Sequence, residues 1–310
     1  MIGRWMVDGR RLLAAGLLLG LAASPAAAAG DDMTGAVRTY RTAYEDTFLD
    51  IARRFDVGYV ELLAANPGVD PWVPGEGTPI TLPTGHLLPD APRRGLVINL
   101  AALRLFYFRP DGSVETHPLG IGRAGWETPL GKTKIVRKRR NPIWYPTKSI
   151  RALRPGLPKV VPAGPANPLG RYALYLGWPT YLIHGTNMPF GVGRRISSGC
   201  IRLYPEDIER LFTEVPVGTP VTVVDQEIAV GWRQGRLYLE VHPNARQVDE
   251  IERDGRFHTR GDLDGLVARV VAAAGDAEAR LDWDAIRRIA IARRGVPEFI
   301  TPAAETASAR

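Results

Sequence analysis

Cysteine is nearly absent from this sequence, because Cys200 is the single cysteine among 310 residues. The chain therefore has no intrachain disulfide and no zinc site built from several thiolates. Long hydrophobic runs are also scarce, and the apolar stretch Leu12–Ala23 is short for a membrane-spanning helix. Charged residues make up 24% and apolar residues 45% of the chain, a balance that excludes wholesale disorder.

Glycine and proline, by contrast, are plentiful. There are 33 glycines and 26 prolines, together about one residue in five, which argues against a helical bundle or a long coiled coil. The formal net charge is +7. The length is sufficient for two domains, or for one domain with a small additional module.

Residues 1–29 have the pattern of an export signal. A basic start, a short apolar stretch and small residues suited to cleavage follow one another, in the order Arg4, Arg10, Arg11, Leu12–Ala23 and Ala27–Ala29. We therefore expect a signal peptide and a mature chain that acts outside the cytoplasm. An uncleaved membrane anchor is the alternative, which the short apolar stretch disfavours. Nucleic acid is a poor partner for an exported protein despite the positive charge.

Residues 38–84 are predicted to form a small module. Apolar residues recur at helical spacing from Phe48 to Phe55, and Thr47 can cap this helix at its amino end. A second short helix is expected over Val57–Ala65 and a strand over Pro79–Pro83.

This helix–helix–strand order, with the segment YEDTFLDIARRFDVGYVELLAANPGVD, resembles a LysM domain. The resemblance implies binding to glycan chains that contain N-acetylglucosamine. A spacer that binds nothing is the alternative. The following segment, His86–Arg94, contains two prolines and is expected to be a linker.

Residues 95–225 change to short strands with period-two patterning. Strands are expected at Leu96–Leu100, Arg104–Phe108, Val114–Leu119, Lys132–Val136, Tyr172–Leu176, Tyr181–His184 and Val221–Val224. A helix is expected from Pro205, since proline and acidic residues suit the first helical turn. Because strands and helices do not alternate, we predict a mainly β fold, with a mostly antiparallel sheet curled into a sandwich or open barrel.

Residues 226–300 are predicted to be a hairpin followed by a helical appendage. The hairpin turns at Gln234-Gly235, and helices are expected over Val248–Arg253, Leu263–Ala273 and Trp283–Arg293. The tail Thr301–Arg310 is expected to be disordered.

Two reactive residues lie sixteen positions apart in the β-rich domain. His184 ends a predicted strand, and Cys200 follows a loop that is rich in glycine. An imidazole next to a thiol can take its proton and produce the nucleophilic thiolate. Backbone N–H groups around Gly199 could stabilise an oxyanion, and Arg202, two residues past Cys200, would lie on the same side of a strand.

Each of these residues has a simpler interpretation. His184 could be a structural histidine, Cys200 an inert buried thiol, and Arg202 half of an ion pair. A metal site made by His184 and Cys200 is disfavoured because no further ligand lies nearby in the sequence; the remaining histidines are scattered at His86, His117, His242 and His258.

The segment HGTNMPFGVGRRISSGCIRLYPEDIERLF, from His184 to Phe212, is similar to the active-site signature of the L,D-transpeptidases of the YkuD type, in particular the ErfK/YbiS group. The segments TPLGKTKIV, NPIWYPT and GPANPLGRYALYL agree with it. The resemblance implies a nucleophilic Cys200, a basic His184 and an orienting backbone carbonyl at Gly185. It further implies substrate-binding or oxyanion roles at Thr186, Asn187, Ser198, Gly199 and Arg202. This chain has Ser198 at a position where a common form of the signature has a second histidine.

The implied reaction is acyl transfer on a peptidoglycan tetrapeptide stem in the periplasm. The thiolate displaces the terminal D-alanine, and the thioester is then resolved by an amine of another stem, giving a 3–3 cross-link, or of an outer-membrane protein. The resemblance implies no metal and no organic cofactor, and acylation of Cys200 by carbapenems.

Several alternatives remain open. Water could resolve the thioester, which would make the protein an L,D-carboxypeptidase or endopeptidase, and a non-catalytic peptidoglycan-binding protein is a rival of another class. An NlpC/P60 enzyme and a sortase are disfavoured by the order and the spacing of histidine and cysteine. The basic run Lys132–Arg140 is either a solvated face or an attractant for stem carboxylates, and residues 137–170 are expected to form a lid over the cleft.

Overall fold

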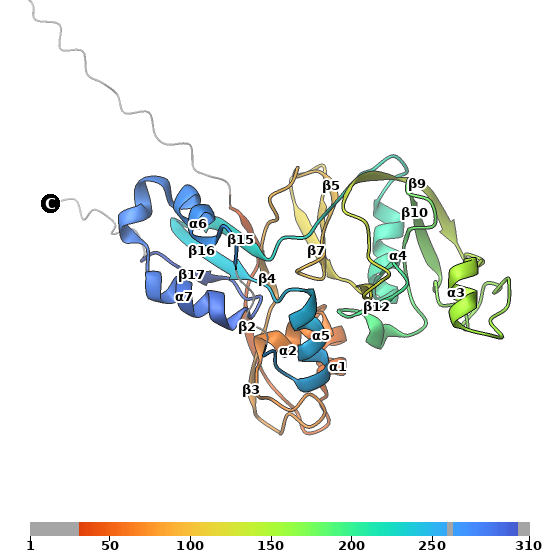
Figure 1. Ribbon diagram of the computed structural model, residues 1–310, viewed down its shortest axis with the longest axis horizontal. Helices are drawn as coiled ribbons and strands as arrows, with labels where there is room; N and C mark the ends of the chain where they lie inside the picture. Colours follow the sequence, from red (N-terminus) through yellow and green to blue (C-terminus); the bar gives the residue numbers. More distant parts are fainter. Residues whose placement is uncertain (1–30, 259–262, 303–310) are drawn as a thin grey trace, which may run out of the picture.

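The computed structural model describes residues 31–258 and 263–302 (Figure 1). The predicted signal peptide and most of the predicted disordered tail lie outside these residues. None of the helices in this described part combines the length and the hydrophobicity of a membrane span. Three parts are arranged around a common junction: an N-terminal module, a β-rich domain and a C-terminal unit.

The β-rich domain is built on one mixed, eight-stranded sheet with the order β13-β11-β10-β9-β14-β5-β6-β7. The strands are β5 Gly95–Asn99, β6 Arg104–Phe108, β7 Val114–Pro118, β9 Gly131–Arg140, β10 Tyr172–Leu176, β11 Leu182–His184, β13 Ile201–Arg202 and β14 Pro220–Val224. A separate pair joins β8 Ile121–Gly122 to β12 Arg195–Ser197. Within the eight-stranded sheet, the pairs β11·β13 and β14·β5 are parallel and the others antiparallel, and the separate pair β8·β12 is parallel. The predicted mainly β, mostly antiparallel fold is therefore confirmed.

The centre of this sheet is buried on both faces. In β5, Leu96, Val97 and Ile98 are all inaccessible to solvent, because Leu96 and Ile98 enter the main core while Val97 packs with Phe106 and Phe108 on the other face. Helix α4 (Pro205–Glu214) packs against β10 and has proline in its first turn, as predicted. A shorter helix, α3 (Lys148–Leu153), lies in the long connection from β9 to β10.

The N-terminal module has the order strand–helix–helix–strand. Its elements are β2 Arg38–Arg41, α1 Phe48–Arg54, α2 Tyr59–Ala65 and β3 Pro79–Leu82, and β2 pairs antiparallel with β3. Thr47 caps α1 by accepting a hydrogen bond from the Asp50 backbone N–H, as predicted. The sequence analysis did not predict β2, because its four residues are mostly exposed and have no apolar alternation.

The segment after the module is not simply a linker. Gly85–Leu87 forms β4, which pairs with β1 (Met33–Gly35), and both His86 and Leu87 are buried. The Leu87 N–H donates to the Glu240 carboxylate at 2.6 Å. The linker prediction was therefore wrong for His86 and Leu87, because the C-terminal hairpin covers them.

The C-terminal unit has its own apolar core. It contains the sheet β15 (Ile228–Arg233), β16 (Arg236–Val241) and β17 (Glu298–Phe299), with helices α6 (Leu266–Ala274) and α7 (Trp283–Ala292) and the 3-10 helix η2 (Gly275–Arg280). The hairpin turns at Gln234-Gly235, as predicted, with both residues at positive φ. Helix α5 (Ala245–Asp254) leaves this unit and packs against α2 of the module.

Candidate active site

His184 is the last residue of β11, and its side chain is buried. Its Nδ1 lies 2.5 Å from the Gly185 carbonyl oxygen, which can only accept a hydrogen bond. Nδ1 must therefore carry the proton, and Nε2 is left as the basic nitrogen. Burial, and to a lesser degree the charge of Arg202, lowers the pKa of His184 to about 3, so the imidazole is neutral at physiological pH.

Cys200 lies directly before β13, after a tightly held turn. Gly199 adopts φ +99°, and a Cβ at this position would come within 3.0 Å of the Tyr181 ring, so glycine is required here. The Ser197 hydroxyl donates to the Cys200 carbonyl at 2.6 Å and accepts from the Gly199 N–H at 3.1 Å. The Thr128 hydroxyl donates to the Gly199 carbonyl at 2.9 Å. The turn that presents the sulfur is thus fixed from both sides.

The sulfur itself is close to Thr180, whose carbonyl oxygen lies 3.5 Å from Sγ. Burial raises the pKa of the Cys200 thiol, while a hydrogen bond from the Leu182 backbone and the positive charge of Arg202 lower it in part. The resting dyad is therefore a thiol and a neutral imidazole rather than an ion pair.

The register of the sheet sets the relationship between these two side chains. Strands β11 and β13 run parallel, with Ile183 opposite Ile201 and His184 opposite Arg202. Because side chains alternate between faces, residues 200 and 202 share the face of His184. The loop of residues 185–199, which includes the 3-10 helix η1 (Pro189–Gly191), thus returns the chain so that the segment with Cys200 leads into a strand paired with the one that ends at His184.

Cys200 opens into a cleft of about 700 Å³. The cleft is lined by Trp126, Arg137, Arg139, Ile143, Trp144, Tyr145, Thr147, Ser149, Ile150, Leu169, Tyr175, Thr180, Tyr181, Leu182, Ser198 and Cys200. Much of one wall comes from the predicted lid, residues 137–170. The amide of Asn167 ties this segment together, since it is inaccessible to solvent and donates to the carbonyls of Pro142 and Pro162 at 2.9 and 3.0 Å.

Of the remaining predicted site residues, one lines the cleft, some are buried and one is exposed. Ser198 lines the cleft. Thr186 is buried and its hydroxyl accepts from the Met188 N–H at 2.9 Å, so it shapes the loop, whereas Asn187 is exposed. Gly185 faces Ile208 of α4, where a Cβ would approach to 3.0 Å. The sequence analysis did not single out Thr128 or the aromatic wall residues individually, although Thr128, Trp144 and Tyr145 lie in segments that carried the resemblance.

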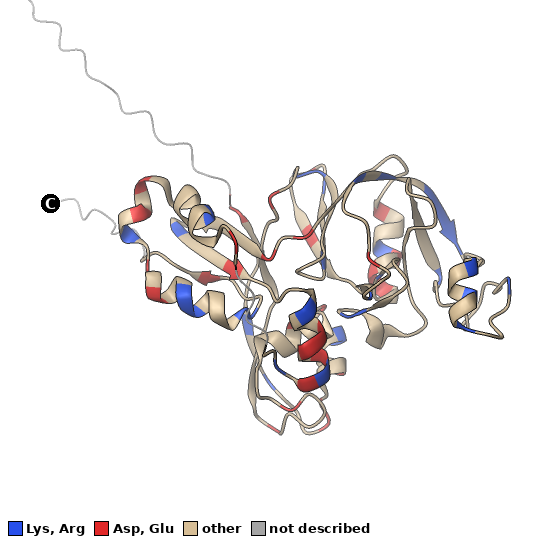
Figure 2. Cartoon of the chain, viewed as in Figure 1, with Lys and Arg blue, Asp and Glu red and all other residues tan. Residues whose placement is uncertain are grey.

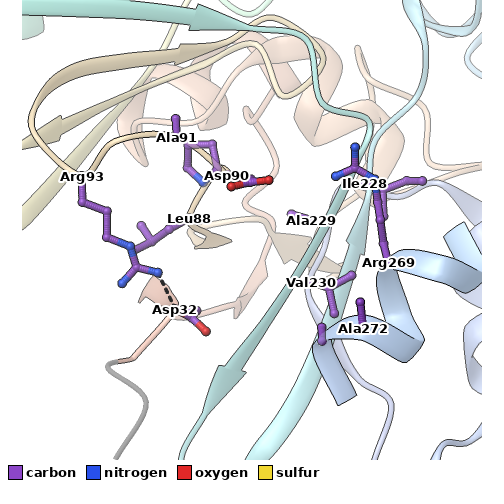
Figure 3. A pocket seen from close by; sticks show the side chains of 12 residues that line it. Asp32, Leu88, Asp90, Ala91, Arg93, Ile228, Ala229, Val230, Arg269 and Ala272 are labelled. Atoms are coloured by element: carbon purple, nitrogen blue, oxygen red, sulfur yellow. Dashed lines mark hydrogen bonds and ion pairs between the residues drawn. The ribbon is translucent and has the colours of Figure 1, made fainter. Parts of the chain in front are cut away.

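A second cavity, of about 460 Å³, lies away from Cys200, between residues 88–93 and the C-terminal unit (Figure 3). Asp32 and Arg93 form an ion pair on one of its sides, and Arg269 of α6 lies on the opposite side. Its lining contains no cysteine or histidine, whereas Cys200 lines the larger cleft.

Comparison with known proteins agrees with this geometry. Residues 93–223 match the YkuD family, described as L,D-transpeptidase catalytic domain. Among relatives in Escherichia coli (strain K12), Probable L,D-transpeptidase YcfS is 47% identical, and the match covers 64% of this chain and 66% of that protein. Probable L,D-transpeptidase ErfK/SrfK is 45% identical, with 73% of this chain and 74% of that protein covered. Probable L,D-transpeptidase YbiS is 45% identical, with 66% of this chain and 69% of that protein covered. The matched region thus spans about two thirds to three quarters of the length of these relatives.

The chain belongs to the YkuD family of L,D-transpeptidases. The resemblance predicted from the segment His184–Phe212 is therefore confirmed at the level of the family.

Proposed function

We propose that this protein is a cysteine-dependent L,D-transpeptidase that acts on peptidoglycan tetrapeptide stems. The observation that carries the proposal is the placement of Cys200 at a 700 Å³ cleft, in the segment that leads into β13, which pairs with the strand that ends at His184. Family membership supports the same reaction class.

The first half-reaction begins with proton transfer from the Cys200 thiol to Nε2 of His184. The sulfur attacks the carbonyl carbon between the third stem residue and the terminal D-alanine, and the carbonyl oxygen becomes an oxyanion. When the intermediate collapses, the C–N bond breaks and the leaving D-alanine takes the proton from His184. A thioester then joins Cys200 to the tripeptide.

The second half-reaction returns the enzyme to its starting state. The amine of an acceptor attacks the thioester, His184 takes the proton that the amine loses, and the sulfur leaves as the thiolate, which takes that proton back. The peptide-bond energy is conserved in the thioester, so no nucleotide is consumed.

The oxyanion is best stabilised by backbone donors of the turn that presents the sulfur. The Gly199 N–H already donates to Ser197, so the N–H groups of Ser198 and Cys200 are the better candidates. Arg202, opposite His184, stabilises the sulfur anion because its charge lowers the pKa of the thiol.

The basic strand β9 supports recognition of the stem carboxylates. Its residues alternate: Arg137 and Arg139 line the cleft, whereas Lys138 donates to the Val215 carbonyl at 2.8 Å on the other face. Arg137 stacks on Tyr175, with its guanidinium 3.8 Å from the ring centre. Basic residues continue from β9 onto α3 (Figure 2), so a substrate anion would meet positive charge at this wall.

The N-terminal module would supply a tether to the glycan. We assign it as LysM-like, in agreement with its strand–helix–helix–strand order, and its exposed Tyr44 and Trp72 are suited to stacking on sugar rings. Periplasmic action, and a second stem or an outer-membrane protein as the acyl acceptor, complete the proposal.

The test is a reaction of purified protein with a tetrapeptide muropeptide, followed by intact-mass analysis. We expect an adduct that retains the tripeptide, which Cys200→Ser abolishes and the distant, exposed substitution Thr213→Ala leaves unchanged. Addition of a second stem should give a dimer. Release of free tripeptide instead would establish a carboxypeptidase, and sedimentation with peptidoglycan without any adduct would establish a non-catalytic binding protein.

A further inference from the structure

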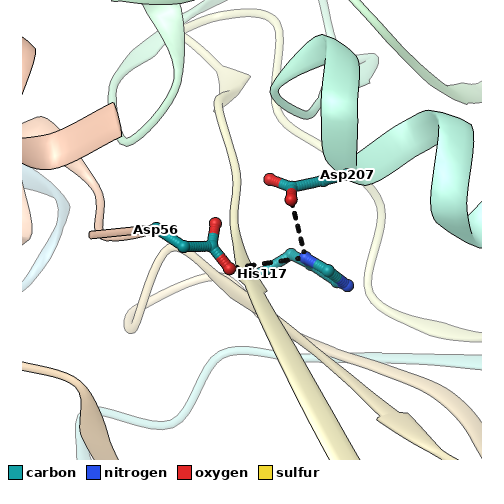
Figure 4. Close-up of side chains that lie close together, drawn as sticks. All are labelled: Asp56, His117 and Asp207. Carbon is teal, nitrogen blue, oxygen red and sulfur yellow. Dashed lines mark ion pairs between the residues drawn. The ribbon is translucent and has the colours of Figure 1, made fainter. Parts of the chain in front are cut away.

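Two carboxylates and one imidazole lie close together where the N-terminal module meets the β-rich domain (Figure 4). Asp56 lies in the turn between α1 and α2, His117 in β7, and Asp207 in the first turn of α4. Nδ1 of His117 lies 3.2 Å from Oδ1 of Asp207 and 3.6 Å from Oδ2 of Asp56. The three potential ligand atoms lie within 4.8 Å of one another.

His117 and Asp207 are buried, and the cluster is not satisfied by hydrogen bonds. His117 is completely inaccessible to solvent, and within the described part of the chain neither of its ring nitrogens has a hydrogen-bond partner. The same holds for Oδ2 of Asp207 and Oδ1 of Asp56. Buried polar atoms without hydrogen-bond partners destabilise the folded state, so a bound species that contacts all three groups would remove a cost.

A further carboxylate fixes the orientation of the imidazole. Nε2 of His117 lies 3.4 Å from Oε1 of Glu115, and Glu115 is itself paired with Arg109 and Arg210. This carboxylate favours a proton on Nε2. Against the effect of burial, the two aspartates likewise favour a proton on Nδ1 and raise the pKa of His117 to about 9, so a bound cation would displace the Nδ1 proton and take its place between the aspartates. Histidines that bind metal ions in proteins are oriented in this way, with the other ring N–H pointing to a carboxylate.

We infer that Asp56, His117 and Asp207 form a divalent metal site that takes Zn²⁺. One imidazole and two carboxylates are a ligand set that zinc accepts, with water in the fourth position. Tetrahedral bonds of about 2.0–2.1 Å place ligand atoms roughly 3.3 Å apart, close to the two observed separations from Nδ1. The Asp56 side chain is 42% exposed and provides the route of entry for the ion and its water.

The site would join two parts of the chain. Asp56 belongs to the module, whereas His117 and Asp207 belong to the sheet and to the helix that follows the Cys200 segment. A bound ion therefore acts as a clip that holds the module against the β-rich domain. Arg53 of α1 and Glu206 of α4 form an ion pair at 2.9 Å across the same junction.

The sequence analysis missed this site for a plain reason. Its three residues are separated by 61 and 90 positions, so no spacing motif exists. His117 was regarded as one of several scattered histidines, and the absence of a metal was predicted from the surroundings of Cys200 and from the family resemblance.

The experiment uses the untagged chain with Cys200→Ser, so that the catalytic thiol cannot bind the metal. The protein is equilibrated with zinc chloride, freed of excess ion and analysed for zinc content, and its affinity is measured by competition with a chromophoric chelator. We expect one zinc per chain, and an affinity weaker by about tenfold or more in Asp56→Asn, His117→Gln and Asp207→Asn. His258→Gln, at an exposed histidine, is the matched control and should bind as the parent does.

Two further readouts make the outcome decisive. Cobalt chloride should give the visible absorption of a tetrahedral site, lost in Asp56→Asn, and zinc should raise the melting temperature of the parent. If the parent retains no zinc at micromolar concentrations, His117 is simply protonated between the aspartates and the inference is overturned. Binding that Asp56→Asn leaves unaltered, at a partly exposed position whose substitution is compatible with folding, would also overturn it. None of these measurements depends on transpeptidase activity.

Discussion

Arg202 lies directly opposite His184 in the parallel pairing of β13 with β11. Its charge disfavours the imidazolium and favours the thiolate, so it lowers the pKa of both members of the dyad. One guanidinium thus adds to the effect of burial in keeping His184 unprotonated, and it makes the Cys200 thiol easier to ionise.

The first prediction concerns this guanidinium. Arg202→Gln should raise the pKa of His184, so the acid limb of the kcat/KM profile moves to higher pH. Because the pKa of Cys200 rises as well, we expect kcat/KM at neutral pH to fall by about tenfold. The measurement is a pH profile of acyl-enzyme formation. Arg171→Gln, at an exposed arginine, should leave the limb in place, and an unshifted limb in Arg202→Gln would refute the assignment.

Thr128 supports the turn of Cys200 without facing the substrate. Thr128→Val keeps the shape of the side chain but removes the hydrogen bond to the Gly199 carbonyl. We expect a stability loss of about 1 kcal/mol and a larger proportional loss of kcat than of KM. The comparison is Thr222→Val in β14, which should affect neither constant; equal kinetics for the two variants would show that the turn holds without Thr128.

The cleft arginines should make activity depend on salt. Arg139→Gln is expected to raise KM for the stem and to weaken the dependence of KM on ionic strength, because a screened attraction is removed. The check is a KM series from low to high sodium chloride. Lys134→Gln, an exposed residue of the same strand outside the cleft lining, should retain the salt dependence of the parent.

The buried pair of Arg104 and Glu61 should contribute strongly to stability. Nη2 of Arg104 lies 2.7 Å from Oε2 of Glu61, and both side chains are almost inaccessible to solvent. Arg104→Met should destabilise the protein by about 3–5 kcal/mol, because the buried Glu61 loses its charged partner and must either stay ionised without it or take up a proton. Urea denaturation would measure this. The double variant Glu61→Gln with Arg104→Met should recover part of the loss, and purely additive effects would argue against a coupled pair.

His242 should make stability depend on pH below neutrality. Burial lowers its pKa to about 4 from an ordinary value of 6.5, so the unfolded chain takes up a proton that the folded chain refuses. Its contribution is complete above pH 6.5 and is lost as the pH falls toward 4. The difference between the urea midpoints at pH 7.5 and pH 4.5 should therefore be smaller in His242→Gln than in the parent. In His258→Gln the difference between the two midpoints should remain.

Local signals explain what could be predicted from the sequence. Thr47 and Pro205 predict the starts of their helices, and Gln234-Gly235 predicts a hairpin. The glycine-rich segment between His184 and Cys200 predicts a reactive pair. These features depend on residues close together in the chain. The burial of His86 and the cluster at His117 depend on contacts between residues more than fifty positions apart. Hydrophobic pattern and secondary-structure propensity do not predict such contacts.

The packing of α5 against α2 has a consequence for how this protein can be divided. Arg294, just beyond α7, also donates to the Ala65 carbonyl at the end of α2, at 3.0 Å. The segments before and after the β-rich domain therefore pack against one another. Excision of either flank would bare apolar surface on the other, so the two should be inherited, lost or transplanted together.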